Sequence, residues 1–333
     1  MNAAGPRVAP WLALLTLSLA GAVIVGLAVG SGNASLVVAL RDPLSVDRDI
    51  VVGLRLPRVI LGAIAGSGLA AVGVVFQAVL RNPLAEPYVL GVSGGAALGA
   101  TLAILLGLGS VAFWGASLVP LVALASGLAA TALVYGMARA TGRRGSEPVL
   151  LAGVVVNAIA SAAITFAKTL VSANKAQELL FWLMGFLDVQ SPSVIAFVAL
   201  YVTLGVGVLL VDAGRLNLLA LGDEAAANLG VDVRRLERRV FVASSLIVGA
   251  IVSTTGLIGF VGLIVPHAMR RLVGSDARRL LPASLLGGAA VLVACDAASR
   301  GLFHLVHREP PVGAITALVG GPLFIALLRR RAR

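Results

Sequence analysis

Long apolar stretches alternate with short polar stretches along the whole chain. A helix that crosses the hydrocarbon core of a bilayer needs about 20 mostly apolar residues, and ten runs come close to that length. These runs are Trp11–Gly30, Pro57–Leu80, Tyr88–Leu108, Ser117–Ala138, Val149–Ser172, Val194–Val211, Leu236–Thr255, Phe260–Val273, Pro282–Arg300 and Val312–Leu328. The pattern predicts an all-α, polytopic membrane protein with about ten transmembrane helices, in a single transmembrane domain over residues 1–333.

Two of these runs are less regular than the others. The first follows Arg7 and has the form of a signal peptide, but the nine runs after it favour a retained anchor. The eighth is short and contains Pro266. Gly256, Gly259 and Gly262 lie between the seventh and eighth runs, so we expect the helix to break there.

The composition supports a membrane protein. Of the 333 residues, 59% are hydrophobic and 12% are charged, with a mean hydropathy of +1.01. An average soluble domain is about 45–50% apolar and about 25% charged, so a soluble enzyme and a disordered chain are both excluded. The single cysteine, Cys295, excludes an intrachain disulfide framework. The net charge of +11 comes from arginines in the loops between the apolar runs. This placement indicates that the positive charge sets the orientation in the membrane, and it does not indicate a nucleic-acid partner.

The distribution of Lys and Arg predicts the orientation. Ten crossings put both termini on one side, and that side collects most of the 26 Lys and Arg residues. Because basic loops stay in the cytoplasm, both termini are predicted to be cytoplasmic.

Few residues could supply the energy source of a transporter, whether by binding ATP or by coupling to an ion. The phosphate-binding loop needs a lysine after glycine, and the only two lysines follow Ala167 and Asn174, so any ATP must be bound by another subunit. Ion coupling would need an intramembrane carboxylate. Asp296 is the deepest candidate, and Arg300, one helical turn away, is its expected structural partner, with a proton relay as the alternative.

No catalytic or metal site is predicted. His304 and His307 lie three residues apart, but no further ligands follow at the spacing of a closed metal site. We expect His267 to be a buried histidine bonded to backbone, and we find no pattern of nucleophile, histidine and acid.

The longest polar interruption, residues 212–239, predicts a short cytoplasmic helix. Gly222 precedes Asp223 and Glu224, alanines follow, and Gly230 ends the segment. Leu221, Ala225 and Leu229 would then form an apolar face outside the membrane. Such a face indicates a docking site for a partner protein, and the alternative is a helix that folds back onto its own bundle.

Five segments together resemble one family. They are RLPR (Arg55–Arg58), FQAVLRNPLAEPYVLGVSGGAALGA (Phe76–Ala100), ALGDEAAANLGV (Ala220–Val231), GLIGFVGLIVPHAMRRLVGSDARRLLP (Gly256–Pro282) and EPPVGAITALVGGPLF (Glu309–Phe324). In this order they are similar to the permease subunits of FecCD-type (type II) ABC importers for iron chelates, haem and cobalamin.

The resemblance implies a non-catalytic permease domain in a bacterial inner membrane. It implies a homodimer surrounded by lipid, two cytoplasmic ATP-binding subunits that hold ATP and Mg²⁺, and a periplasmic substrate-binding protein; this chain itself would hold no cofactor. The implied function is ATP-driven import of a bulky metal chelate, with a ferric siderophore expected first and haem or cobalamin next. An ion-coupled secondary transporter is the alternative.

The resemblance also assigns residues. The helix that couples to the ATPase corresponds to Leu221, Gly222, Asp223, Glu224, Ala225, Leu229 and Gly230. Outward arginines that meet glutamates of the binding protein correspond to Arg55, Arg58 and Arg300; the alternative for the first two is that they reach to lipid phosphate. Residues of the gate and pathway correspond to Asn82, Leu84, Ser146, Glu147, Phe181 and Trp182, although the sequence Ser-Glu-Pro departs from the small or hydroxylated residues of the family. The alternative for Phe181 and Trp182 is that they anchor the chain at the membrane interface.

Overall fold

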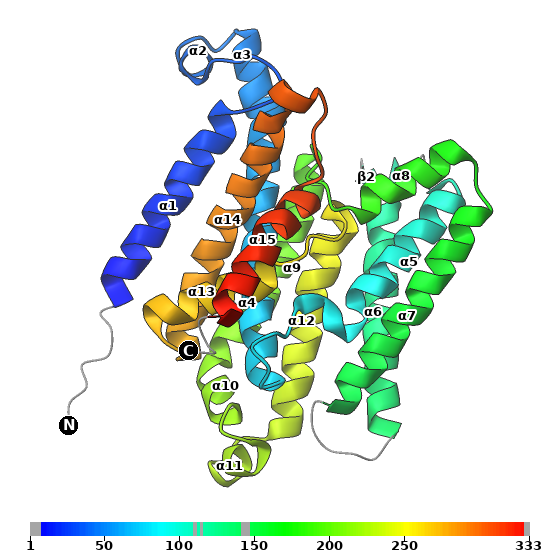
Figure 1. Cartoon of the computed structure of the whole chain (residues 1–333), viewed down its shortest axis with the longest axis vertical. Helices are drawn as coiled ribbons and strands as arrows, with labels where there is room; N and C mark the ends of the chain where they lie inside the picture. The colour runs from blue at the N-terminus through cyan, green and yellow to red at the C-terminus, as the bar shows by residue number, and fades with distance from the viewer. Residues whose placement is uncertain (1–7, 109–111, 114–115, 141–146, 330–333) are drawn as a thin grey trace.

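The computed structural model describes the chain except residues 1–7, 109–111, 114–115, 141–146 and 330–333, and it is a helical bundle (Figure 1). The long helices are α1 (Val8–Ala28), α4 (Leu56–Val79), α5 (Val92–Leu105), α6 (Val119–Ala140), α7 (Glu147–Thr169), α9 (Pro192–Val211), α12 (Val233–Thr255), α13 (Val261–Val273), α14 (Ala277–Val306) and α15 (Val312–Arg329). The shorter elements are α2 (Leu36–Arg41), α3 (Val46–Arg48), η1 (Asp49–Arg55), η2 (Pro87–Leu90), α8 (Ala173–Leu183), α10 (Ala213–Leu219), α11 (Asp223–Asn228) and the antiparallel strands β1 (Ala112–Phe113) and β2 (Ala116–Ser117).

Each predicted apolar run overlaps one of the long helices. Among the described residues, six helical segments have both the length and the hydropathy of a membrane span, namely α1, α4 together with the turns before it, α6, α7, α9 and α14. Helices α5 and α15 are shorter but apolar. The all-α, multi-pass class is therefore confirmed, while the number of crossings and the side of the termini stay predictions.

Helices α4 and α14 form the centre of the bundle, and their apolar windows are 78% and 67% buried. Glycines permit their close approach. A Cβ added to Gly66 would lie 2.2 Å from the carbonyl oxygen of Gly288 in α14, and one added to Gly73 would lie 1.8 Å from that of Gly262 in α13. Small residues at such crossings let helices pack backbone to backbone in lipid.

The predicted break between α12 and α13 is confirmed. Helix α12 ends at Thr255, α13 begins at Val261, and both Gly256 and Phe260 have positive φ angles, +65° and +69°. We call residues 256–260 the α12–α13 break.

The two ends of the bundle differ (Figure 1). Helices α10 and α11 lie at the same end as the start of α1, and we call this the α11 end. Helices α2, α3 and α8 lie at the opposite end, called the α8 end. The segment from Ser31 to Leu54, which joins the first two apolar runs, is largely helical.

Candidate functional site

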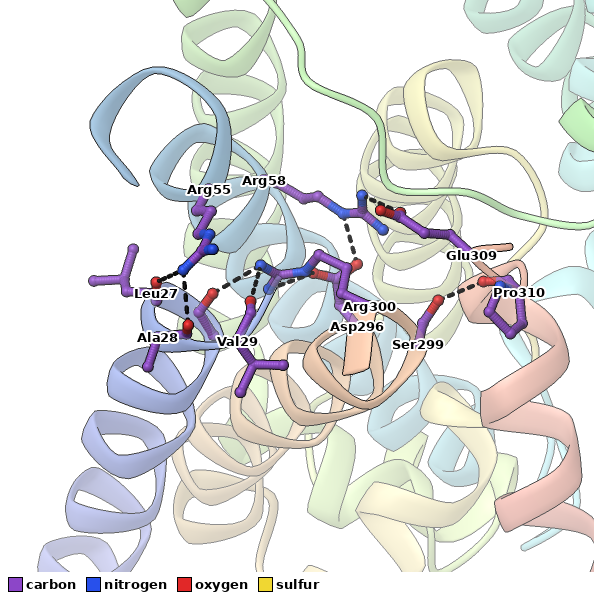
Figure 2. Close-up of polar contacts among 11 residues, drawn as sticks. Leu27, Ala28, Val29, Arg55, Arg58, Asp296, Ser299, Arg300, Glu309 and Pro310 are labelled. Atoms are coloured by element: carbon purple, nitrogen blue, oxygen red, sulfur yellow. Dashed lines mark hydrogen bonds and ion pairs between the residues drawn. The ribbon is translucent and has the colours of Figure 1, made fainter. Parts of the chain in front are cut away.

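A buried cluster of charges lies near the α8 end (Figure 2). Arg58 donates from Nε to Oδ1 of Asp296 and from Nη1 to Oε2 of Glu309, both at 2.8 Å. Arg300 meets the other carboxylate oxygen of Asp296 with Nε at 3.0 Å and Nη2 at 2.9 Å. The cluster joins α4, α14 and the turn before α15. It confirms the predicted pair of Asp296 and Arg300, and both oxygens of Asp296 have partners, which supports a structural role.

Glu309 links this cluster to the end of the bundle. Burial raises the pKa of its carboxyl group, but the hydrogen bond and positive charge of Arg58 outweigh that effect, so the pKa lies below its ordinary value. Phe186 covers the guanidinium group of Arg58, with the ring centroid 5.0 Å from Cζ. Phe186 therefore covers one side of the ion pair, and Glu309 stays charged at neutral pH.

Two arginines also hold the last turn of α1 (Figure 2). Arg55 donates to the carbonyl oxygens of Leu27 and Ala28 at 2.8 and 2.7 Å. Arg300 donates to those of Gly26 and Val29 at 2.8 and 2.7 Å. The last carbonyls of a helix have no intrahelical partners, and here guanidinium groups satisfy them.

The prediction that Arg55, Arg58 and Arg300 face outward is wrong. Their exposed fractions are 4%, 7% and 3%, and each guanidinium group is bonded to acceptors of the same chain. The lipid-phosphate alternative for the first two fails for the same reason. A charge buried away from water needs a partner, and the acceptors that supply it come from α1, α14 and Glu309, which are distant in sequence.

A cavity of about 860 Å³ opens beside the cluster. Its lining includes Phe181 and Trp182 of α8, together with Phe186 and Glu309. Helix α8 follows the fifth apolar run and is amphipathic, with Leu179 buried and Phe181 exposed. The two aromatic residues of the proposed gate thus line a real cavity at this end.

At the α11 end, α11 forms as predicted and ends before Gly230, which has a φ of +84°. Leu221 and Leu229 are 67% and 58% exposed, and Ala225 is half-buried. Ala226 is fully buried, so one side of the helix packs on its own bundle while both leucines stay uncovered. The apolar face predicted for docking is therefore available on the described chain.

Polar contacts fix the position of α10 and α11. Asp212 is fully buried, and its carboxylate pairs with Arg215 at 2.6 Å and with Arg239 of α12 at 3.1 Å. Asn217 donates to Asp276 at 2.6 Å and accepts from the backbone N–H of residue 277 at 2.7 Å, which ties α10 to α14. Sequence reasoning missed the contacts of Asp212 with Arg239 and of Asn217 with Asp276 because each joins residues on different helices.

The residues expected at the inner gate lie near this end. Asn82 accepts from the backbone N–H of Leu84 at 2.9 Å, and Leu84 is 44% exposed. Glu147 is exposed at the start of α7, and Ser146 lies outside the described residues. A cleft of about 1100 Å³ lies between α6, the start of α7, α11 and α12, and Glu224 lines it.

The burial and the contacts of the histidines bear on whether they could serve as metal ligands. His267 is half-buried, and the ring of His304 lies 3.1 Å from the carbonyl oxygen of Gly30. Within the part of the chain that the structure describes, His, Cys, Asp and Glu form no group of three that could hold a metal ion.

Three features together define a multi-pass membrane transport protein. Several helices are apolar and long enough to span a bilayer, a buried charge cluster lies at one end, and at the other end polar contacts hold a short helix flanked by exposed leucines. Residues 14–330 match the FecCD transport family. The chain belongs to this family, and it is the permease subunit of an ABC importer in the inner membrane.

Curated relatives cover most of the chain. It is 44% identical to the cobalamin import system permease BtuC of Halobacterium salinarum, over 85% of this chain and 74% of the relative. It is 37% identical to the hemin transport system permease HmuU of Yersinia pestis, over 98% and 97%. A solved structure, described as an inward-facing conformation of a metal-chelate type ABC transporter, has 32% identity and a TM-score of 0.85 over 97% of this chain and 99% of that one.

Proposed function

We propose that this permease works as a homodimer, with ten crossings per subunit and cytoplasmic termini, and that it imports a metal-containing tetrapyrrole driven by ATP. The support for the cargo is that the similar curated permeases are named for cobalamin and hemin. Cobalamin comes first because the relative at 44% identity carries that name. We therefore propose a corrinoid or haem ahead of the ferric siderophore that the family resemblance implied first.

The observation that carries ATP coupling is the pair of exposed leucines that flank α11. Leu221 and Leu229 offer apolar surface to water at the end of the bundle, a surface that a partner protein covers at low cost. We assign the whole stretch Leu221–Gly230, including Asp223, Glu224 and Ala225, to the contact with two cytoplasmic ATP-binding subunits, which hold ATP and Mg²⁺. The permease itself holds no cofactor.

The proposed mechanism is a change of access. Closure of the ATP-bound partners displaces α11, and the bundle shifts between two arrangements open to opposite sides. Asn82, Leu84, Ser146 and Glu147 form the inner gate, and Phe181 and Trp182 of α8 form the outer gate. A substrate-binding protein docks at the α8 end and delivers the cargo.

Proteoliposomes containing the permease, its ATP-binding subunits and its binding protein test this function. With ATP supplied to the nucleotide-binding side, cyanocobalamin uptake should exceed uptake of hemin and of ferrichrome. Preferred uptake of ferrichrome would overturn the cargo assignment. Uptake by the permease alone, driven by a proton or sodium gradient, would instead support a secondary transporter and overturn ATP coupling.

A further inference from the structure

The segment from Arg81 to Tyr88 connects α4 to η2 and touches two distant parts of the bundle. One end contacts the helix pair α10–α11, and the other contacts the α12–α13 break. The segment is short and contains two prolines, Pro83 and Pro87, which restrict its backbone. Contacts at both ends of a stiff segment make it suited to transmit displacement.

The first end is held by Arg81. Its guanidinium group forms an ion pair with Asp223 in the first turn of α11, and its Nε donates to the carbonyl oxygen of Leu219 at the end of α10, at 3.3 Å. Arg81 has a φ of +46°, a conformation that residues other than glycine rarely adopt. The backbone is held in a disfavoured conformation at the point where it meets α11.

The middle of the segment is a compact turn. The backbone N–H of Ala85 donates to the carbonyl oxygen of Asn82 at 3.0 Å, and Ala85 is 3% exposed. Pro87 packs closely on α13, since a Cβ added to Gly262 would lie 2.3 Å from its ring. The turn therefore has little room to deform independently of its neighbours.

The other end carries the backbone of the α12–α13 break. Glu86 accepts the N–H of Phe260 at 2.9 Å. The hydroxyl of Tyr88 accepts the N–H of Ile258 at 2.9 Å and donates to its carbonyl oxygen at 2.7 Å. A break in a helix frees backbone groups that must find partners inside the protein, and these two side chains provide them.

The break in turn lies against α8 and the residues after it. The backbone N–H of Phe186 donates to the carbonyl oxygen of Thr255 at 2.8 Å. A Cβ added to Gly256 would lie 2.0 Å from the carbonyl oxygen of Trp182. Contacts thus run without interruption from α11 through residues 81–88 and the break to Trp182, which lines the cavity at the α8 end.

We propose that residues 81–88 are a positioning relay that transmits displacement of α11 to the α12–α13 break and from there to α8. Arg81 is the input, through Asp223, and Glu86 and Tyr88 are the output. This inference deepens the proposed function, on which its role in transport rests. The contacts themselves are independent of the cargo and of the energy source.

Backbone hydrogen exchange on the purified full-length permease in nanodiscs tests the relay without any transport. Arg81→Asn removes the ion pair, and asparagine tolerates the positive φ at least as well as arginine does, so the turn keeps its backbone conformation while the contact with Asp223 is lost. The exchange rates of residues 256–260 should rise roughly two- to fivefold, the factor by which loss of a half-exposed ion pair shifts a local opening. Tyr88→Phe should raise exchange at Ile258 directly.

Asp232→Asn is the matched control. It removes one carboxylate at the same end of the bundle, and asparagine preserves the cap that Asp232 forms on α12. It should leave exchange in the break unchanged. Unchanged exchange in Arg81→Asn, or an equal rise in the control, would overturn the relay.

The transport test uses the charge exchange Arg81→Asp with Asp223→Arg in the reconstituted complex. Each single variant should transport several-fold less cyanocobalamin per ATP hydrolysed, and the double variant should regain most of that ratio. Equal ratios in all variants would overturn the relay. If the wild-type complex shows no ATP-driven uptake, the proposed function fails, and the exchange experiment still decides the relay.

Discussion

Replacement of Asp296 by asparagine is expected to destabilise the permease strongly. Asp296 is 1% exposed and is the acceptor shared by two buried arginines. Removal of one partner from a buried charge network costs about 3–5 kcal/mol. Arg58 would keep Glu309, and Arg300 would keep two carbonyls of α1, so the lower end of that range applies.

The assay is thermal unfolding of the detergent-solubilised protein, followed by size-exclusion chromatography. At about 2.1 cal/mol/K per residue, the unfolding entropy of the 333 residues is about 0.7 kcal/mol/K, so a loss of about 3 kcal/mol lowers the midpoint by roughly 4 °C. Asp49→Asn, on an exposed residue of η1, is the control and should change stability by less than about 0.5 kcal/mol. Asp296→Asn combined with Arg300→Gln should recover most of the loss. A midpoint for Asp296→Asn equal to that of the control would refute the reasoning.

Three further predictions concern other parts of the molecule. Leu229→Asp should weaken co-purification with the ATP-binding subunits by about 100-fold or more, because it buries an unpaired charge in the contact. The control Leu44→Asp, on a side chain 95% exposed between α2 and α3, should leave co-purification unchanged. Equal recovery of the two variants would contradict the docking assignment. Gly73→Ala places a Cβ against the backbone of α13 and should cost about 1–3 kcal/mol in thermal unfolding, whereas Gly21→Ala meets nothing within 4 Å and should be silent. A hydrogen bond from Asn217 lowers the pKa of Asp276. The ionised form therefore stabilises the fold above the unfolded pKa of about 3.9, and this gain is lost as pH falls through the lower folded value. Asp276→Asn should reduce the melting midpoint at about pH 6, and the difference from wild type should shrink as the pH is lowered; a difference that stays constant into acid would contradict this.

The helical elements could be predicted because lipid demands a distinctive pattern. A run of apolar residues is long enough to read directly, and the short helix α11 carries its own signals in Asp223, Glu224 and Gly230. The pair of Asp296 and Arg300 was also readable, since four residues separate its members on one helix.

The tertiary contacts could not be predicted in the same way. Arg58 and Glu309 are separated by 251 residues, and nothing local indicates that they meet. The family resemblance implied an outward role for Arg58, but the folded chain supplies its own acceptors. The contact of Arg81 with Asp223 depends on how α4 and α11 pack, so the sequence around Arg81 does not indicate it.

The attachment of α1 has a consequence for the order of synthesis. The acceptors at Gly26 and Val29 precede their donor, Arg300, by 274 and 271 residues. At about 5–20 residues per second, the ribosome takes roughly 15–50 s to make the chain between them. During that interval the first helix resides in lipid without its final partner. Its window is only 11% buried even in the finished fold, and its mean hydropathy of 2.2 suits a segment that must remain stable in the bilayer while the rest of the protein is made.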